Sequence, residues 1–270
     1  MAKIRLDVLL HERGLIPTRA MAKAVIMSGS VFVNGERAIK PGMQIEESAE
    51  VDVRGGEQKY ASRGGLKLEK ALQYFGVSPD GKVCIDCGAS TGGFTDCLLQ
   101  NGAKLVYAVD VGYGQLAWSL RSDPRVIVME RTNVRHLTRD KFETRPQLAA
   151  IDVSFISLKL VLPAVREVLT DDGEVICLIK PQFEAGRGSV GKKGVVRDRQ
   201  THKSVLDVFL INAEEAGFRV QGLTFSPVTG PEGNIEYLGW INSDADCAEI
   251  DTEAIVSASH DELLRSSSDE

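Results

Sequence analysis

Three charged residues stand in apolar stretches that are typical of buried strands. Asp152 lies in LAAIDVSF, Lys180 follows VICLI, and Glu236 lies in NIEYLGW, where we expect it inside the strand. Pro181 keeps the strand before it from continuing through the middle of a sheet, so Lys180 is expected at a strand tip. Because a buried charge is costly unless it is paired, the three side chains are expected to converge. They could form a structural ion pair, but three such residues at strand ends favour a functional site.

A glycine-rich segment, DCGASTGGF, follows the predicted strand VCIDCG and opens a predicted helix. It is not a G-x-G-x-x-G dinucleotide motif, because Ser90 replaces the second glycine, and it is not a P-loop. Asp110 ends the next predicted strand, where an acid can accept hydrogen bonds from both ribose hydroxyls of a nucleoside. The loop and the acid together predict S-adenosylmethionine as the cofactor. The predicted cofactor contacts are Gly88, Ala89, Ser90, Thr91, Gly92, Gly93, Phe94, Asp110, Val111 and Asn133.

The elements that must position these residues form an α/β pattern. From residue 83 onward, strand-like and helix-like segments alternate, which predicts a doubly wound sheet that binds ligands at the carboxyl ends of its strands. The last two strands, FRVQGLTFSP and NIEYLGWI, are predicted to form an antiparallel pair at an edge. We expect this domain to span residues 65–243.

Residues 1–58 have a different pattern and predict a small α+β domain. RLDVLL and PTRAMAKAVIMSG predict two helices, the second with Thr18 as its N-cap and Gly29 as its stop, and Asn34-Gly35 predicts a hairpin. Arg19 and Lys23, four residues apart, share one helix face. This face could bind phosphates or be merely solvated.

The charge is unevenly distributed along the chain. Residues 1–45 hold seven Lys/Arg and three Asp/Glu, whereas residues 243–270 hold nine Asp/Glu and one Arg. A basic front and an acidic end are typical of a chain that meets a polyanion with one end. Residues 244–270 are expected to be an acidic tail that could contain a short helix.

Several other classes of protein lack support in the sequence. No apolar run reaches the length of about 18 residues that a membrane helix needs, and the N-terminus lacks a signal-peptide core, so we expect a cytoplasmic protein. The five cysteines are expected to be buried, reduced thiols, with Cys84 and Cys87 on opposite faces of a strand. The four histidines lack ligand spacing, so no metal is expected.

Two glycine-containing segments need an interpretation of their own. SRGG, within residues 59–64, is small and predicts a flexible interdomain linker. PQFEAGRGSVGKKGVVR, after Lys180, has four glycines and four bases. It could be a disordered loop, but beside the site it is expected to close over an RNA strand, with Phe183 available for stacking.

The motifs in combination resemble known families. RLDVLL…TRAMAKAVIMSGSVFVNG resembles the α-L RNA-binding module found in a ribosomal protein, tyrosyl-tRNA synthetases and pseudouridine synthases. SRGGLKL, IDVSF, LIKPQFE and NIEYLGW resemble the Lys-Asp-Lys-Glu tetrad of the FtsJ-like ribose 2′-O-methyltransferases, which have a Rossmann-like sheet. From about residue 3 to 242 the chain resembles the TlyA, or haemolysin A, family.

The resemblance implies methyl transfer from S-adenosylmethionine to a cytidine 2′-hydroxyl in ribosomal RNA. It implies Lys67, Asp152, Lys180 and Glu236 as the tetrad, with Lys70 as the competitor for the first position. In this interpretation Lys180 is the general base, Asp152 orients it, and Glu236 pairs with Lys67. The expected partner is ribosomal RNA or a ribosomal subunit, without a membrane or a metal. The expected RNA contacts are Arg5, Arg19, Lys23, Arg63, Arg187, Lys192 and Lys193. A membrane-active haemolysin and a non-catalytic ribosome assembly factor remain alternatives.

Overall fold

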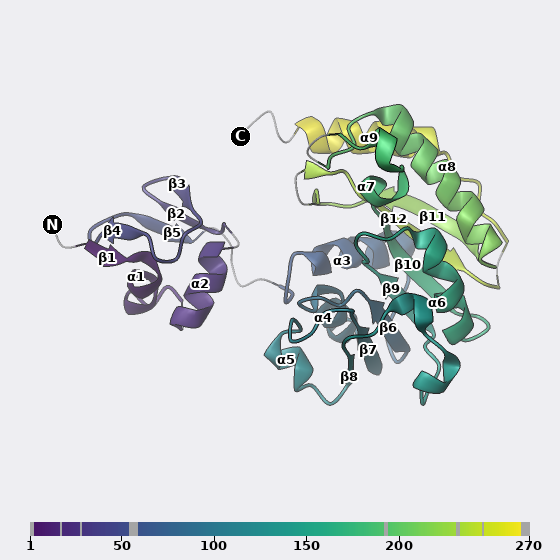
Figure 1. The fold of residues 1–270 in the computed structure, drawn as a ribbon, viewed down its shortest axis with the longest axis horizontal. Coiled ribbons are helices and arrows are strands. Elements are labelled where there is room, and N and C mark those ends of the chain that lie inside the picture. Colours follow the sequence, from purple (N-terminus) through teal and green to yellow (C-terminus); the bar gives the residue numbers. More distant parts are fainter. Residues whose placement is uncertain are drawn as a thin grey trace. The chain divides into compact units, whose positions relative to one another are not determined.

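The computed structural model describes residues 3–16, 18–27, 29–53, 59–191, 194–230, 233–244 and 246–265. The chain divides into two units, Met1–Gln58 and Lys59–Glu270, which are described separately (Figure 1).

The N-terminal unit packs two helices against short antiparallel strands. Leu6, Leu9 and Leu10 lie on the buried face of the first helix and meet Ile26 of the second in a small core. Strand β1 pairs with β4, and β2 lies between β3 and β5. The elements are β1 (Lys3–Arg5), α1 (Leu6–Glu12), α2 (Arg19–Met27), β2 (Val31–Val33), β3 (Glu36–Ala38), β4 (Gln44–Glu46) and β5 (Val51–Val53).

The N-cap and the hairpin turn that the sequence predicts in this unit are both confirmed. Thr18 Oγ1 accepts a hydrogen bond from the backbone N–H of Met21 at 3.2 Å, as an N-cap does. Asn34 and Gly35 both have positive φ, 51° and 83°, between the paired strands β2 and β3. This is the two-residue hairpin that Asn-Gly predicts, because a type I′ turn needs positive φ at both central residues.

The described residues of the C-terminal unit form a seven-stranded sheet in the order β11-β12-β10-β9-β6-β7-β8. Strand β12 runs antiparallel to β10 and β11, which confirms the antiparallel pair, and the other neighbouring strands are parallel. Chain order reverses between β6 and β9, so a crevice is expected beyond their carboxyl ends. The strands are β6 (Val83–Cys87), β7 (Leu105–Val109), β8 (Val126–Met129), β9 (Leu148–Ile151), β10 (Glu174–Ile179), β11 (Arg219–Phe225) and β12 (Tyr237–Asn242).

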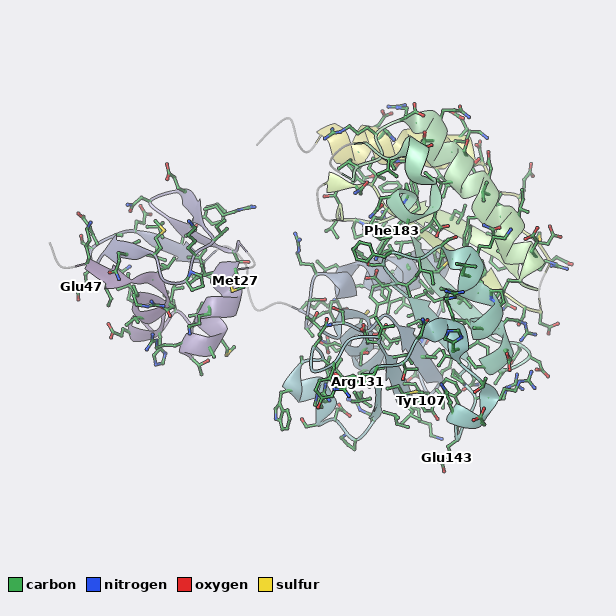
Figure 2. The ribbon with its side chains drawn as sticks, viewed as in Figure 1. Met27, Glu47, Tyr107, Arg131, Glu143 and Phe183 are labelled. Atoms are coloured by element: carbon green, nitrogen blue, oxygen red, sulfur yellow. The ribbon has the colours of Figure 1, made fainter. Side chains whose placement is uncertain are left out.

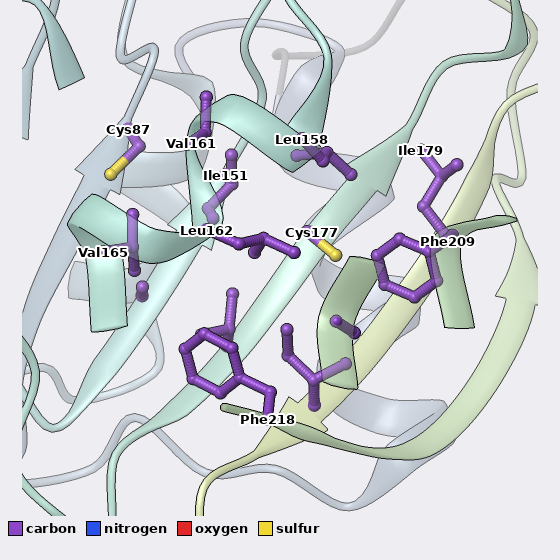
Figure 3. Close-up of a cluster of buried hydrophobic side chains, with 14 of the residues drawn as sticks. Cys87, Ile151, Leu158, Val161, Leu162, Val165, Cys177, Ile179, Phe209 and Phe218 are labelled. Atoms are coloured by element: carbon purple, nitrogen blue, oxygen red, sulfur yellow. The ribbon is translucent and has the colours of Figure 1, made fainter. Parts of the chain in front are cut away.

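Helices cover both faces of this sheet. One face packs against α6, α8 and Val256 of α9, and Figure 3 shows part of this core, including Cys87, Cys177 and Phe209. The other face packs against α3 and α4. The helices are α3 (Gly64–Phe75), α4 (Gly93–Gln100), α5 (Trp118–Arg121), α6 (Leu162–Val168), α7 (Pro181–Glu184), α8 (Arg199–Glu215) and α9 (Thr252–Arg265). The short 3-10 helices are η1 (Val134–His136), η2 (Arg139–Lys141), η3 (Leu158–Leu160) and η4 (Arg187–Ser189).

Cys84 and Cys87, which have C-x-x-C spacing, are core residues. Cys84 and Cys87 belong to the cores on opposite faces of the sheet, as the strand periodicity predicts. Burial raises the pKa of Cys84 to about 12, so its thiol is not poised to react. All five cysteines are free, but Cys247 is exposed, which corrects the expectation for that residue.

Two segments differ from the sequence-based description. The segment expected as an acidic tail contains α9, a 14-residue helix that packs on α8 and β11 through buried residues such as Val256. The segment expected as a flexible linker is held on the C-terminal unit. Tyr60 is buried, the N–H of Ala61 donates to Asp96, and helix α3 already begins at Gly64. None of the helices in the described ranges is long and apolar enough to cross a membrane.

Candidate active site

Lys180 lies where β10 ends and α7 begins. Its Nζ lies 2.5 Å from Oδ1 of Asp152, which directly follows the neighbouring strand β9. Parallel strands bring their carboxyl ends to one edge, and here Ile151 of β9 is in register with Cys177 of β10. The lysine is 8% exposed, so the ion pair forms in a largely desolvated place.

A second ion pair faces the first across one cavity. Lys67 Nζ, from α3, lies 2.5 Å from Oε2 of Glu236, and both residues are buried. Lys70, the competitor for this position, lies over the ring of Phe225 instead, at 3.9 Å from its centroid. Of the two lysines, Lys67 is the one that lines this cavity.

The position of Glu236 corrects the sequence prediction. It precedes β12, which begins at Tyr237, rather than lying inside the strand. Because β12 is antiparallel to β10 and Tyr237 pairs with Ile179, the start of β12 lies beside the end of β10. The carboxylate thus reaches the same rim as Lys180 from an antiparallel strand.

All four predicted tetrad side chains line a cavity of about 290 Å³. Two lysines and two carboxylates balance in charge, which offsets the cost of burying them. Glu236 Oε1 has no hydrogen-bond donor within the described part of the chain, so this buried oxygen retains capacity to accept one. Arg63, also predicted for RNA contact, lines the same cavity and is exposed.

A larger cavity, of about 570 Å³, adjoins the first. Its lining includes Asp110, Val111 and Asn133, and it shares Gly88, Ser90 and Asp152 with the tetrad cavity. This volume lies in the range typical of small-molecule sites, about 300–1,000 Å³. Of the other predicted cofactor contacts, Ala89, Thr91, Gly93 and Phe94 line the tetrad cavity, and Gly92 lines neither.

The residues present fit a nucleoside cofactor. Asp110 directly follows β7, which ends at Val109, and its carboxylate accepts from the backbone N–H of Ser90 at 2.8 Å and of Gly112 at 2.6 Å. These bonds fix an acceptor at the cavity wall, where ribose hydroxyls can be bound. Asn133 also lines this cavity, while its Oδ1 caps η1 through the N–H of Arg135.

Gly88 allows the two loops of the site to meet. A Cβ at this position would lie 2.5 Å from the carbonyl oxygen of Asp152, and φ is +95°. Glycine is therefore required here by the close approach of the chain that carries Asp152.

The sequence analysis did not single out Asp86, although it is, like Asp152, an acidic residue in an apolar stretch typical of a buried strand. Asp86 is fully buried in β6, and its Oδ2 accepts from Thr95 Oγ1 at 2.7 Å. Its Oδ1 has no hydrogen-bond partner among the described residues. Burial raises the pKa of Asp86 to about 7.

Sequence reasoning also missed Phe155, which has an unusual backbone. Its φ is +64°, a conformation that phenylalanine rarely adopts, and the side chain is 90% exposed. Its ring lies 5.0 Å from that of Phe183, which is labelled in Figure 2. The loop after β9 and helix α7 thus present two neighbouring aromatic rings.

The structure places some of the predicted RNA contacts and not others. Arg5 and Arg19 both contact buried Asp7, at 2.9 and 3.5 Å, and Lys23 is exposed on α2. The pKa of Asp7 is lowered chiefly by its hydrogen bond with Arg5. Lys192 and Lys193 lie outside the described residues, and the Arg187 side chain is likewise not described. No group of three or more potential metal ligands occurs among the residues that the structure describes.

The doubly wound sheet, the cleft at its switch point and the adjoining lysine–carboxylate pairs define a methyltransferase of the FtsJ-like class. The family model described as FtsJ-like methyltransferase matches residues 60–243, and that of the S4 domain matches residues 4–51, the segment predicted as the α-L module.

Individual relatives narrow the family. The Bacillus subtilis protein YqxC, named as an rRNA methyltransferase, is 56% identical, over 87% of this chain and 84% of its own. The Mycobacterium tuberculosis 16S/23S rRNA (cytidine-2′-O)-methyltransferase TlyA is 46% identical, over 91% and 92%. A solved Streptococcus thermophilus structure, named as a hemolysin, is 48% identical with a TM-score of 0.80 and covers 99% of each chain. The chain belongs to the TlyA, or haemolysin A, family of FtsJ-like methyltransferases.

Proposed function

We propose that this protein transfers a methyl group from S-adenosylmethionine to the 2′-hydroxyl of a cytidine in ribosomal RNA. The observation that carries the proposal is one cavity lined by Lys67, Asp152, Lys180 and Glu236 beside a cleft that contains Asp110. The substrate assignment rests on the relative TlyA, whose name states this activity.

When bound, S-adenosylmethionine supplies a sulfonium methyl carbon that a nucleophile can attack. The residues of this chain act on the nucleophile. Lys180, as a neutral amine, would accept the proton of the 2′-hydroxyl, which leaves the ribose oxygen free to bond to the methyl carbon that the cofactor would supply. Asp152 stabilises the ammonium that results, because their atoms lie 2.5 Å apart.

The Lys67–Glu236 pair holds the ribose in this mechanism. The unpaired Oε1 of Glu236 can accept a hydrogen bond from a sugar hydroxyl, and Lys67 keeps this carboxylate in place. In-line placement of hydroxyl and methyl can lower a barrier by roughly 7–11 kcal/mol, so positioning is expected to supply a large share of the rate.

The S4 domain anchors the substrate in this proposal. Arg19 and Lys23 lie on one face of α2 and are exposed, so they can contact phosphates. Such contacts position a protein on structured RNA without selecting a sequence. The choice of nucleotide is then left to the C-terminal unit.

Substitution of Lys180 tests the chemistry. Lys180→Ala should reduce methyl incorporation into ribosomal subunits by at least about 100-fold, the usual contribution of a general base. Lys180→Arg should be equally inactive, because arginine is not deprotonated in a protein. Tritium transfer from labelled cofactor measures both, and calorimetric cofactor binding serves as the control for folding. Near-normal turnover in the arginine variant would contradict a role as base.

The family's second name, haemolysin, requires its own measurement. Lysis of red cells by the purified wild-type and Lys180→Ala proteins separates a membrane-active protein from an enzyme. We expect no lysis by either protein. A non-catalytic assembly factor is distinguished by the methyl-transfer assay itself, since it would bind subunits without labelling them.

A further inference from the structure

The Lys180 amine has a second oxygen beside it. Nζ lies 2.5 Å from Asp152 Oδ1 and donates to Ser154 Oγ at 3.0 Å. Both oxygens come from one short loop, the one that follows β9. Ser154 is not a member of the tetrad that the sequence motifs predict.

The two oxygens have a specific consequence for a neutral amine. A neutral lysine amine has two N–H groups and one lone pair in a tetrahedral arrangement. Without a partner, the amine can rotate about the Cε–Nζ bond and point its lone pair in any direction. The hydrogen bond to Ser154 Oγ engages one N–H, and the Asp152 carboxylate, which forms an ion pair with the amine but no hydrogen bond at Oδ1, repels the lone pair, so fewer directions are left for it.

We infer that Ser154 is a positioning residue that, together with Asp152, orients the lone pair of Lys180 toward the substrate hydroxyl. The inference rests on the proposed role of Lys180 as general base. During the reaction the lone pair accepts the hydroxyl proton, and the resulting ammonium keeps its ion pair with Asp152 and its hydrogen bond to Ser154 while the new N–H faces the substrate oxygen.

Helix α7 connects Lys180 to the loop that carries Ser154, here called the serine loop. Glu184, at the end of this helix, accepts from Ser157 Oγ at 2.6 Å and from the N–H of Leu158 at 2.8 Å. This four-residue helix thus has Lys180 at its N-cap, and its last residue, Glu184, hydrogen-bonds to the far end of the serine loop. The neighbouring rings of Phe155 and Phe183, tilted by 48° to each other, add a third contact between the same two segments.

The surroundings of Ser154 make the idea testable. The residue is exposed, whereas Lys180 is 8% exposed, so the hydroxyl reaches inward from the mouth of the site. Replacing an exposed serine usually changes stability little. A loss of activity in Ser154→Ala with an unchanged thermal midpoint would therefore come from the site rather than from the fold.

The experiment compares Ser154→Ala and Ser154→Thr with wild type in single-turnover methylation of ribosomal subunits across a pH series. In the alanine variant the plateau rate constant should fall by about 10- to 100-fold, less than or equal to the loss on removing a general base. Half-saturation for RNA and the dissociation constant of the cofactor should stay within about twofold. Threonine keeps the hydroxyl and should restore most of the rate.

The pH dependence of the rate distinguishes a serine that orients Lys180 from one that only supports the local structure. A hydrogen bond to a charged donor is stronger than one to a neutral donor, so the hydroxyl favours the ammonium form. Its removal should move the midpoint of the rising limb to lower pH, by about half a unit to one unit. Ser119→Ala, an exposed serine on α5, is the matched control and should leave rate and midpoint unchanged.

The outcomes separate the inference from the proposed function. If Lys180→Ala keeps its activity, the proposed base is wrong whatever Ser154 does. If Lys180→Ala is inactive but Ser154→Ala has a wild-type rate and midpoint, or Ser154→Thr is as slow as Ser154→Ala, the positioning role is overturned. A loss confined to half-saturation for RNA would also overturn it, because that would make Ser154 a substrate contact.

Discussion

At the scale of single residues, Asp86 should make the stability of the protein depend on pH. Burial raises its pKa to about 7 from an ordinary value of 3.8, so between these values the folded chain retains a proton that the unfolded chain has lost. The free energy of unfolding should therefore fall as pH rises from about 4 to about 7, by at most about 4 kcal/mol.

Asp86→Asn tests this expectation, because the amide mimics the protonated acid and its oxygen can still accept from Thr95. The variant should lose less stability than wild type between pH 5 and pH 8, and should be the more stable of the two at pH 8. Urea unfolding at both pH values provides the measurement. Parallel pH dependence in the two proteins would show that Asp86 is ionised in the folded state.

The sequence identified single residues where a charge interrupts an apolar strand. Asp152 and Lys180 were found in this way because desolvating a charge is costly and therefore informative. Ser154 and Glu184 carry no such signal, since polar residues in loops are common. Phe155 could not be predicted either, because its φ of +64° is set by the surrounding contacts rather than by its residue type.

At the scale of elements, Gly88 should be needed for the site to assemble. Gly88→Ala would place a Cβ 2.5 Å from the carbonyl oxygen of Asp152 and would push this residue away from Lys180. Gly76→Ala is the matched control, because φ is also positive there, +68°, but no atom lies within 4 Å of the added Cβ.

Both alanine variants should lose about 1 kcal/mol of stability to the left-handed backbone. Gly88→Ala should lose more than this and should also lose methyl transfer, whereas Gly76→Ala should remain active. Thermal unfolding and the methylation assay report the two effects. Equal activity in the two variants would mean that the loop after β9 adjusts without disturbing Asp152.

The packing of α9 on α8 should also depend on pH. His202 Nδ1, on α8, lies 2.9 Å from Nε2 of His260 on α9, and the Tyr237 hydroxyl of β12 hydrogen-bonds to the same Nδ1 at 3.1 Å. Burial, and then His260, lower the pKa of His202 to about 4. Asp198, Arg199 and Asp261 are the charged groups that act on this pair.

The lowered pKa of His202 makes stability depend on pH in the opposite direction to the raised pKa of Asp86. Its stabilising contribution is complete above pH 6.5 and is lost as pH falls toward 4, because the unfolded chain takes up the proton first. Amide exchange of Thr252–Arg265, corrected for its intrinsic rate, should therefore be faster at pH 5 than at pH 7. His202→Gln, whose amide does not titrate in this range, should reduce that difference; an undiminished difference would assign it to other groups.

The elements themselves were largely predictable, but where some of them begin and what they pack against were not. Alternation of strand and helix patterns predicted the doubly wound sheet, and a turn-only connection predicted the antiparallel pair. Glu236 was misplaced because an apolar pattern does not show where a strand begins. The last helix was described as a tail because its charge hid the apolar side that carries Val256, which only packing against α8 and β11 explains.

At the scale of the whole molecule, the proposal divides the work between two units. The N-terminal unit contributes exposed Arg19 and Lys23, and the C-terminal unit contains the cavities. If the units have these roles, RNA affinity and cofactor affinity should respond to different substitutions.

The double variant Arg19→Glu and Lys23→Glu tests this division. It should bind ribosomal subunits more weakly, because phosphate contacts are lost, and its affinity should depend less on salt, because fewer counterions are released. The slope of log affinity against log salt should become shallower by about one to two units for two lost contacts. Cofactor affinity, measured by calorimetry without RNA, should stay unchanged.

The control for this test must carry the same change of charge on the other unit. Lys104→Glu and Lys141→Glu alter two exposed lysines of the C-terminal unit, outside the residues that line the two cavities. This control should retain most of the affinity and of the salt slope, because a general change in net charge acts weakly at physiological ionic strength. If both double variants weakened binding and flattened the slope equally, the effect would come from net charge and the S4 domain would not be the RNA anchor.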